Sequence, residues 1–184
     1  YIGIHLPQLD FEDEQPCLLW SRGDTTGVFQ HESSGIREIL VQLPPSCLED
    51  PVALAALCRP GPLGSGMVGQ FIDGKHGRIQ VKYDLPQLEP ILKETYGVIL
   101  YQEQVMKVSQ VLAHYSLGAA DLLRRAMGKK QAEDMAKQQA RFMEGAKANH
   151  IDPPQAGQIF HLVANFAQTG FNTSHRPSAA TLPD

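Results

Sequence analysis

The sequence lacks long hydrophobic runs, a signal peptide and paired cysteines. No apolar segment approaches the roughly 20 residues that a transmembrane helix requires, and residues 1–10 have neither a basic region nor an apolar signal core. We therefore expect a cytoplasmic protein with no membrane partner. Hydrophobic residues make up 42% of the 184-residue chain and charged residues 20%, which is typical of a globular domain and unlike a disordered chain.

The sequence also lacks the cysteine motifs of common metal and disulfide sites, and its one glycine motif lies in the wrong context for a cofactor site. Cys17, Cys47 and Cys58 are widely spaced without a Cys-x-x-Cys, so neither a disulfide framework nor a zinc site is expected, and we predict reduced, buried thiols. Residues 64–69 match G-x-G-x-x-G, but they follow a predicted helix where a dinucleotide site requires a strand. A Walker-A pattern is absent, which removes the main support for a simple ATPase or GTPase.

What the sequence does contain is helical periodicity between proline and glycine breaks. It predicts helices over residues 36–43, 51–58, 86–96, 101–115, 132–146 and 153–166, and a shorter helix that ends at Gly128. Asp50 is the predicted N-cap of the second helix, with Pro51 at its first position. The best strand candidate is residues 77–85. The fold class is therefore mainly α, with at most one or two short strands.

Charge is distributed unevenly along an acidic chain. The formal net charge is −4, and residues 1–60 hold nine acidic against three basic residues. Residues 119–150 reverse this, with seven basic against four acidic residues. Such asymmetry indicates an anionic partner at one place in the structure.

The basic segment contains LLRRAMGKK, whose four cations are Arg124, Arg125, Lys129 and Lys130. Neighbouring residues of a helix point about 100° apart, but long guanidinium arms can converge on a ligand as large as a triphosphate or a nucleic-acid backbone. Arginine suits such a ligand because its planar fork binds phosphate bidentately and keeps its proton.

The residues around this arginine pair are expected to hold its helix in place. Leu122, Leu123 and Met127 are predicted to anchor the helix in a core. The alternative is a solvated helix end, where cations interact favourably with the carbonyl dipole. The motif alone leaves both interpretations open.

A second basic segment is FIDGKHGR, residues 71–78, which places Lys75, His76 and Arg78 on a predicted glycine-bounded turn. Such a turn can contact phosphates through side chains and backbone amides. A solvated loop that happens to be basic explains the composition equally well.

A third segment, GFNTSH, places Asn172 and His175 after a glycine. His175 either contacts a sugar or phosphate or is an ordinary surface residue, and the spacing does not decide between them. The sequence shows no Ser-His-Asp or Cys-His arrangement, so no nucleophilic catalysis is predicted.

Five segments resemble, in the same order, the C-family of bacterial replicative DNA polymerases, the DNA polymerase III alpha subunits. These segments are GVFQHESSGIREIL, ALCRPGPLGSGMV, FIDGKHGR, YGVILYQEQVMKVSQVLAHYSLGAADLLRRAMGKK and GFNTSH. The resemblance implies that residues 1–175 form the largely helical fingers region of such an enzyme, which folds over the incoming nucleotide and the template. Residues 176–184 then form a divergent or truncated tail.

The resemblance also implies roles for particular residues. Arg124 and Arg125 match the family's arginine pair that contacts the incoming triphosphate. Asn172 and His175 match a segment that lines the nucleotide pocket. Lys129 and Lys130 match the family's basic positions after the glycine and are expected to contact DNA or phosphate, as are Lys75 and Arg78 on the strength of their basic turn. Arg59 matches the arginine of the family's R-P-G-P loop, which shapes the site.

The chain departs from the family's usual pattern at several positions. Where the family usually has leucine, arginine, tyrosine and lysine, the chain has His31, Gly74, Thr169 and Thr173. After His175 the family continues into an apolar helix, whereas this chain has RPSAATLPD.

If the resemblance holds, the complete protein is a DNA-directed DNA polymerase of DNA replication. It would use deoxynucleoside triphosphates, a DNA primer-template, and Mg²⁺ held by aspartates of a palm that the family places upstream of this chain. A sliding clamp and a proofreading subunit are the expected partners. The missing initiator Met suggests a piece of a longer protein, and this chain alone is expected to be inactive. The alternatives are a non-catalytic nucleic-acid-binding or vestigial fragment, and an error-prone paralogue.

Overall fold

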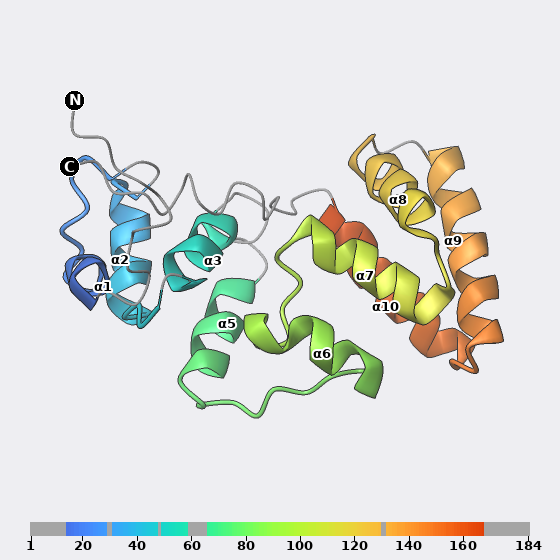
Figure 1. Cartoon of the computed structure of the whole chain (residues 1–184), viewed down its shortest axis with the longest axis horizontal. Helices are drawn as coiled ribbons and strands as arrows, with labels where there is room; N and C mark the ends of the chain where they lie inside the picture. Colours follow the sequence, from blue (N-terminus) through green and yellow to red (C-terminus); the bar gives the residue numbers. More distant parts are fainter. Residues whose placement is uncertain (1–13, 29–30, 48, 59–65, 130–131, 168–184) are drawn as a thin grey trace. The chain divides into compact units, whose positions relative to one another are not determined.

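The computed structural model describes residues 14–28, 31–47, 49–58, 66–129 and 132–167, and the chain divides into two compact units. The first unit contains α1 (Glu14–Ser21), α2 (Ser34–Gln42) and α3 (Glu49–Leu57). The second contains α5 (Met67–Lys75), η2 (Pro86–Leu88), α6 (Glu89–Leu92), η3 (Lys93–Thr95), α7 (Gln102–Ala113), α8 (Leu117–Lys129), α9 (Ala132–Ala148) and α10 (Pro153–Ala167) (Figure 1). The described ranges contain helices and no strand, so the mainly α fold class is confirmed.

The candidate strand over residues 77–85 does not form, although the alternation of buried and exposed side chains is present. Val81, Tyr83 and Leu85 are partly buried, and the residues between them are exposed. Tyr83 and Leu85 pack against the core of the second unit. A strand also needs a partner for its backbone hydrogen bonds. No second extended segment in the described ranges pairs with this one, so it remains an irregular connection between α5 and η2.

The first unit packs its three helices around Trp20, which is almost fully buried. The other large buried side chains are Leu40, Leu43, Leu54 and Leu57. His31 is also fully buried. Its Nε2 atom lies 3.4 Å from the carbonyl oxygen of Pro51, so a polar side chain at a core position has a polar neighbour.

Asp50 differs from its predicted role as the N-cap of α3. The helix begins at Glu49, two residues before the predicted first position at Pro51, and the Asp50 side chain turns back toward the preceding segment. Its Oδ2 atom accepts hydrogen bonds from the backbone N–H groups of Ser46, at 2.7 Å, and Cys47, at 3.3 Å. The buried carboxylate therefore stabilises the turn that leads into α3.

The prediction of three buried thiols is wrong for Cys47. Cys47 is exposed because it lies in the turn before α3, and Cys17 and Cys58 are half-buried. Burial raises the pKa of the Cys58 thiol to about 11, so this thiol stays protonated at neutral pH.

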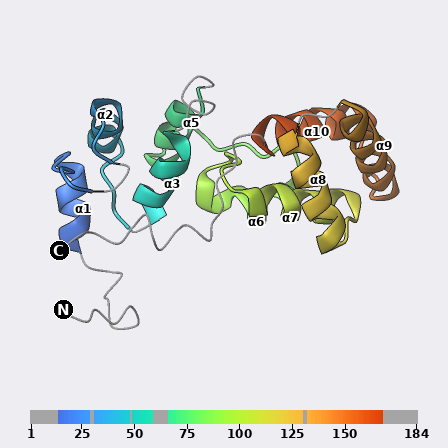
Figure 2. The ribbon, with the colours of Figure 1, turned by 90° about the horizontal axis from the view of Figure 1, so that it is seen from above.

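The second unit is organised around α7, which packs against α6, α8, α9 and α10 (Figures 1 and 2). The predicted amphipathic face of this helix is confirmed, because Val105, Val108 and Leu112 have no exposed surface. From the other helices, Phe142 of α9 and Phe160 of α10 extend the core, with ring centroids 5.4 Å apart.

A single buried amide, Gln104, fixes the start of α7. Its Oε1 atom accepts hydrogen bonds from the backbone N–H groups of Leu100, at 2.8 Å, and Tyr101, at 3.0 Å. Its Nε2 atom donates to the carbonyl oxygen of Ile91, at 3.2 Å, and to Oγ1 of Thr95, at 2.9 Å. The side chain thus uses both its acceptor and its donors to join α6 and η3 to the first turn of α7.

The other end of α7 lies very close to α9. A Cβ atom at Gly145 would lie 2.7 Å from the carbonyl carbon of Ala113, closer than real Cβ contacts allow. In the same region, Nδ2 of Asn149 donates to the carbonyl oxygens of Val111, at 3.0 Å, and Leu112, at 3.3 Å. These bonds satisfy carbonyl groups at the end of α7 that have no partner within the helix.

We predict that Gly145→Ala destabilises the chain by about 1–3 kcal/mol, because the added methyl group separates α7 from α9. Gly157→Ala is the matched control, since Gly157 lies in α10 and, apart from the adjoining backbone of its own helix, a methyl group added there would have no atom of the described residues within 4 Å. The control should stabilise the chain by about 0.5–1 kcal/mol, the usual gain in a helix interior. Urea denaturation measures both. Equal effects of the two substitutions would contradict the close approach.

Candidate phosphate-binding site

The arginine pair lies on α8, which begins after a serine cap. Oγ of Ser116 accepts a hydrogen bond from the backbone N–H of Ala119 at 3.3 Å, which satisfies one donor of the first turn. Leu123 is fully buried and anchors the helix as predicted. Leu122 does not, because its side chain is 60% exposed. The Met127 side chain lies outside the described part of the chain.

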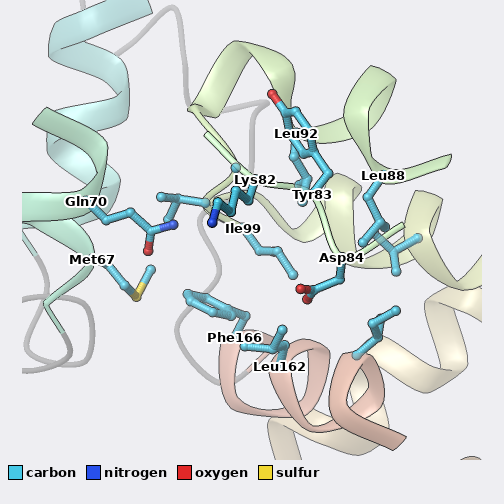
Figure 3. Close-up of a pocket in the computed structure, with 14 residues that line it drawn as sticks. Met67, Gln70, Lys82, Tyr83, Asp84, Leu88, Leu92, Ile99, Leu162 and Phe166 are labelled. Atoms are coloured by element: carbon cyan, nitrogen blue, oxygen red, sulfur yellow. The ribbon is translucent and has the colours of Figure 1, made fainter. Parts of the chain in front are cut away.

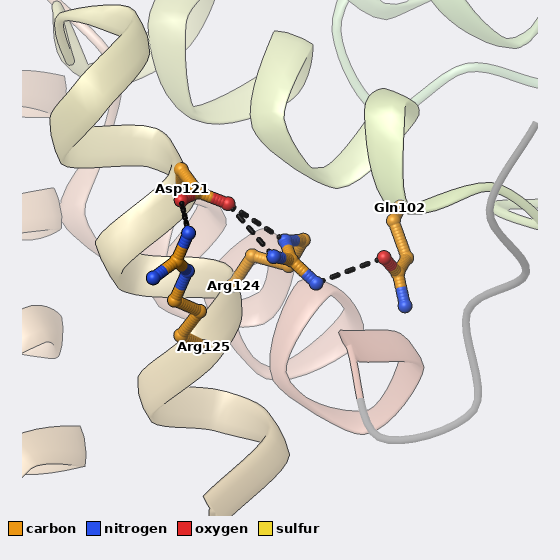
Figure 4. Close-up of polar contacts among 4 residues, drawn as sticks. All are labelled: Gln102, Asp121, Arg124 and Arg125. Carbon is orange, nitrogen blue, oxygen red and sulfur yellow. Dashed lines mark hydrogen bonds and ion pairs between the residues drawn. The ribbon is translucent and has the colours of Figure 1, made fainter. Parts of the chain in front are cut away.

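Asp121 brings the two arginines together. Its Oδ1 atom accepts from Nε of Arg124, at 3.0 Å, and from Nη2 of Arg124, at 2.8 Å. Its Oδ2 atom lies 2.8 Å from Nη2 of Arg125. The two arginines diverge along the helix, but Asp121 lies three and four residues before them, the spacing at which helical side chains meet. Each oxygen of one carboxylate therefore holds one guanidinium group (Figure 4).

Gln102, the first residue of α7, holds Arg124 from a second direction. Its Oε1 atom accepts a hydrogen bond from Nη1 of Arg124 at 2.9 Å (Figure 4). Because guanidinium groups can only donate, the Gln102 atom that faces Arg124 must be the carbonyl oxygen. Arg124 is thus joined to two helices, whereas the described contacts of Arg125 are with its own helix.

Arg124, which contacts two helices, is more buried than Arg125, whose described contacts are with its own helix alone. The Arg124 side chain is 26% exposed and the Arg125 side chain is 63% exposed. The hydrogen bond from Arg124 is the main cause that lowers the pKa of Asp121; desolvation opposes it, and the positive charges of Arg124 and Arg125 lower the pKa further. At neutral pH the cluster therefore contains two positive charges and one negative charge, and it can attract a further anion.

The basic segment after α5 is a separate feature. Residues 71–75 of FIDGKHGR belong to α5 itself, so the predicted turn is confined to the residues that follow. Arg78 forms an exposed ion pair with Asp73 at 3.2 Å, and Lys75 lies in the last turn of α5. Figures 1 and 2 draw α6 and α7 between α5 and α8, so this segment and the arginine pair do not form one cluster.

Several residues assigned from the sequence lie outside the described part of the chain. These are Arg59, Lys130, Asn172 and His175, together with the side chain of Lys129. Their predicted roles remain predictions.

A cavity of about 550 Å³ lies elsewhere in the second unit, between α5, α7 and α10 (Figure 3). Its lining includes Met67, Leu88, Leu92, Ile99, Val108, Ile159, Leu162 and Phe166, with Lys82 and Asp84 as charged members. None of the described cations that the sequence assigned to phosphate is part of this lining. The mostly apolar wall does not suit a polyphosphate.

The described residues contain no group of three or more His, Cys, Asp or Glu side chains that could hold a metal ion. They therefore do not fit the Mg²⁺ site of a polymerase, and no chemical step through a metal follows from them. In the described ranges, no helix is long and apolar enough to cross a membrane.

The structure thus defines a helical domain with a carboxylate-anchored arginine pair, a class of site suited to anions. The chain belongs to the family of the bacterial DNA polymerase III alpha subunit finger domain, whose sequence model matches residues 1–150. It is 54% identical over 181 residues to the DNA polymerase III subunit alpha of Pseudomonas aeruginosa, 56% identical over 184 residues to that of Vibrio cholerae, and 50% identical over 184 residues to that of Escherichia coli K12.

These alignments cover nearly all of this chain but little of the relatives. They include 94%, 97% and 97% of the chain, and 15%, 16% and 16% of the relatives from P. aeruginosa, V. cholerae and E. coli, respectively. The chain therefore spans about one sixth of the length of the curated relatives that it matches.

The pairing of Asp121 with Arg124 and Arg125 predicts how the stabilising effect of this carboxylate depends on pH. The arginines lower the folded-state pKa of Asp121 below its ordinary value of 3.8. The ionised carboxylate therefore makes its full contribution to folding stability at any pH well above 3.8. It is lost only as the pH falls through the lower, folded-state pKa. The difference in Tm between the unsubstituted chain and Asp121→Asn should therefore stay constant from about pH 7 to about pH 5 and shrink at more acidic pH.

Thermal melts by circular dichroism at a series of pH values measure this difference. Asp134→Asn on α9 is the control for removing one carboxylate from the same unit. A Tm difference for Asp121→Asn that already shrinks between about pH 7 and about pH 5 would show that the arginines do not hold the carboxylate ionised.

Proposed function

We propose that the chain acts as the fingers region of a bacterial replicative DNA polymerase and that Arg124 and Arg125 contact the incoming nucleoside triphosphate. The observation that carries the proposal is the pairing of both guanidinium groups with the two oxygens of Asp121. This arrangement places two permanent positive charges beside each other on a helix anchored in a core. Membership of the finger-domain family supports the same function.

The two arginines can work without large rearrangement because their scaffold is already formed. A phosphoryl group that approaches the cluster meets guanidinium groups held by short hydrogen bonds, so little ordering remains to be done on binding. Charge-assisted contacts of arginine to phosphate neutralise the negative charge of a triphosphate and fix its orientation. In this proposal the fingers supply orientation and charge, and the chemical step takes place on the palm.

The remaining parts of the proposal concern the complete protein. Residues 1–175 act as the fingers, and residues 176–184 are a divergent or truncated tail. Primer-template DNA contacts the basic residues Lys75, Arg78, Lys129 and Lys130, and Asn172 and His175 line the nucleotide pocket. Mg²⁺ is held by aspartates outside this chain, and the complete protein works with a sliding clamp and a proofreading subunit.

We predict that the 184-residue chain alone does not extend a primer in the presence of Mg²⁺. The described residues contain no cluster of metal-binding carboxylates, and in-line nucleotidyl transfer depends on such a cluster. A primer-extension assay with radiolabelled primer measures the activity. A chimeric alpha subunit, in which this chain replaces the matching segment of the P. aeruginosa relative, should extend the same primer. Extension by the chain alone, or none by the chimera, would contradict the proposal.

In the chimeric alpha subunit, Arg124→Ala and Arg125→Ala should each lower kcat/KM for the nucleotide by roughly tenfold to a hundredfold. This estimate follows from about 1.5–3 kcal/mol for each charge-assisted contact. The affinity for DNA should change much less. Lysine at either position should restore activity only in part, because it keeps the charge but loses the bidentate fork.

Lys137→Ala, which removes an exposed cation from α9, is the control for a general loss of charge. If the arginines only stabilise a helix end, both alanine substitutions should cost about 0.3–1 kcal/mol of stability and leave the nucleotide kinetics unchanged. Steady-state kinetics and thermal melts on the same proteins separate these two outcomes. Unchanged kcat and KM in both variants would reject the contact with the triphosphate.

A further inference from the structure

We propose that Gln102 is a positioning residue for Arg124, which it holds in the orientation that contacts phosphate. The inference rests on the proposed function of the arginine pair and adds a residue from a different helix. Gln102 and Arg124 are 22 positions apart in the sequence, and their hydrogen bond is 2.9 Å long. In this proposal Gln102 acts through Arg124 and does not contact the nucleotide itself.

The donors of Arg124 show why a second anchor matters. A guanidinium group has five N–H donors, one on Nε and two on each terminal nitrogen. Asp121 receives one from Nε and one from Nη2, and Gln102 receives one from Nη1. Among the contacts of the described residues, one N–H on each terminal nitrogen remains for a ligand. Two parallel donors on neighbouring nitrogens are what bidentate recognition of phosphate requires.

Asp121 alone leaves one movement of this group unrestrained. Both of its bonds to Arg124 end on the same oxygen, Oδ1, so the guanidinium plane can pivot about that atom. The contact from Gln102 reaches the opposite terminal nitrogen and prevents the pivot. Arg125, the exposed neighbour of Arg124, has no second anchor among its described contacts. The two arginines are therefore held to different degrees.

Gln102 is itself well fixed, because it is the first residue of α7. The buried side chain of Gln104 holds the same turn of the helix through two backbone N–H groups and through contacts to α6 and η3. The core of the second unit thus sets the position of Gln102, and Gln102 in turn sets the orientation of Arg124. A polar residue anchored in this way is suited to positioning.

The test uses Gln102→Ala and Gln102→Met in the chimeric alpha subunit. Methionine keeps the length and helix propensity of glutamine but lacks the acceptor oxygen, so it separates the hydrogen bond from packing. Both variants should raise the nucleotide KM roughly three- to tenfold, because one of three bonds to the guanidinium group is lost. The Kd for primer-template DNA and the Tm should match those of Gln110→Ala, which removes an amide elsewhere on α7.

A double-mutant cycle tests whether Gln102 acts through Arg124. The variant with both Gln102→Ala and Arg124→Ala should have a kcat/KM within about twofold of Arg124→Ala alone. If the two substitutions lower kcat/KM by factors that multiply in the double variant, Gln102 acts independently of Arg124 and the inference is overturned. If Arg124→Ala impairs nucleotide use but the Gln102 variants behave like Gln110→Ala, only the positioning role is wrong. If Arg124→Ala itself has no effect, the contact proposed between Arg124 and the triphosphate fails, and this inference fails with it.

Discussion

The burial of α7 is the constraint on which the second unit depends. Its apolar face is fully covered by the surrounding helices, and both of its ends are fixed by polar or close contacts. At the start, Gln104 satisfies the backbone donors of Leu100 and Tyr101. At the end, Gly145 allows α9 to approach, and Asn149 occupies terminal carbonyl groups. A helix held at both ends is a rigid support for Gln102 at its first position, and the Gln102 side chain accepts a hydrogen bond from Arg124.

Helix periodicity predicted most of this fold from the sequence. The face of α7, the start of α10 at Pro153 and the extent of α9 follow from local spacing and capping, which depend on neighbours in the chain. The candidate strand over residues 77–85 does not form because strand pairing depends on a distant partner that the local pattern does not contain. Leu122 was misplaced for a related reason, since a helix with a narrow buried face exposes one of two adjacent leucines.

The candidate site shows the same division between local and distant contacts. Asp121 could have been found from the sequence, because an acid three and four residues before two arginines is a recognised helical pairing. Gln102 could not, because its contact depends on how α7 and α8 pack across 22 positions. Sequence reasoning assigned the cations from their chemistry, but the groups that orient those cations became visible only with the packing of the helices.

A carboxylate in a site proposed for a polyanion has a physical explanation. Two unpaired arginines side by side would repel each other, and long side chains without partners lose their fixed geometry. Asp121 reduces the repulsion between the arginines and fixes their geometry, and it leaves the three side chains with a net positive charge. A triphosphate carries more negative charge than one carboxylate, so it can bind without displacing Asp121. The carboxylate also reduces the attraction for a released anionic product, which in an enzyme of many turnovers favours dissociation over tight ground-state binding. On the proposed function, the same three side chains that order the site therefore also limit how strongly it holds phosphate.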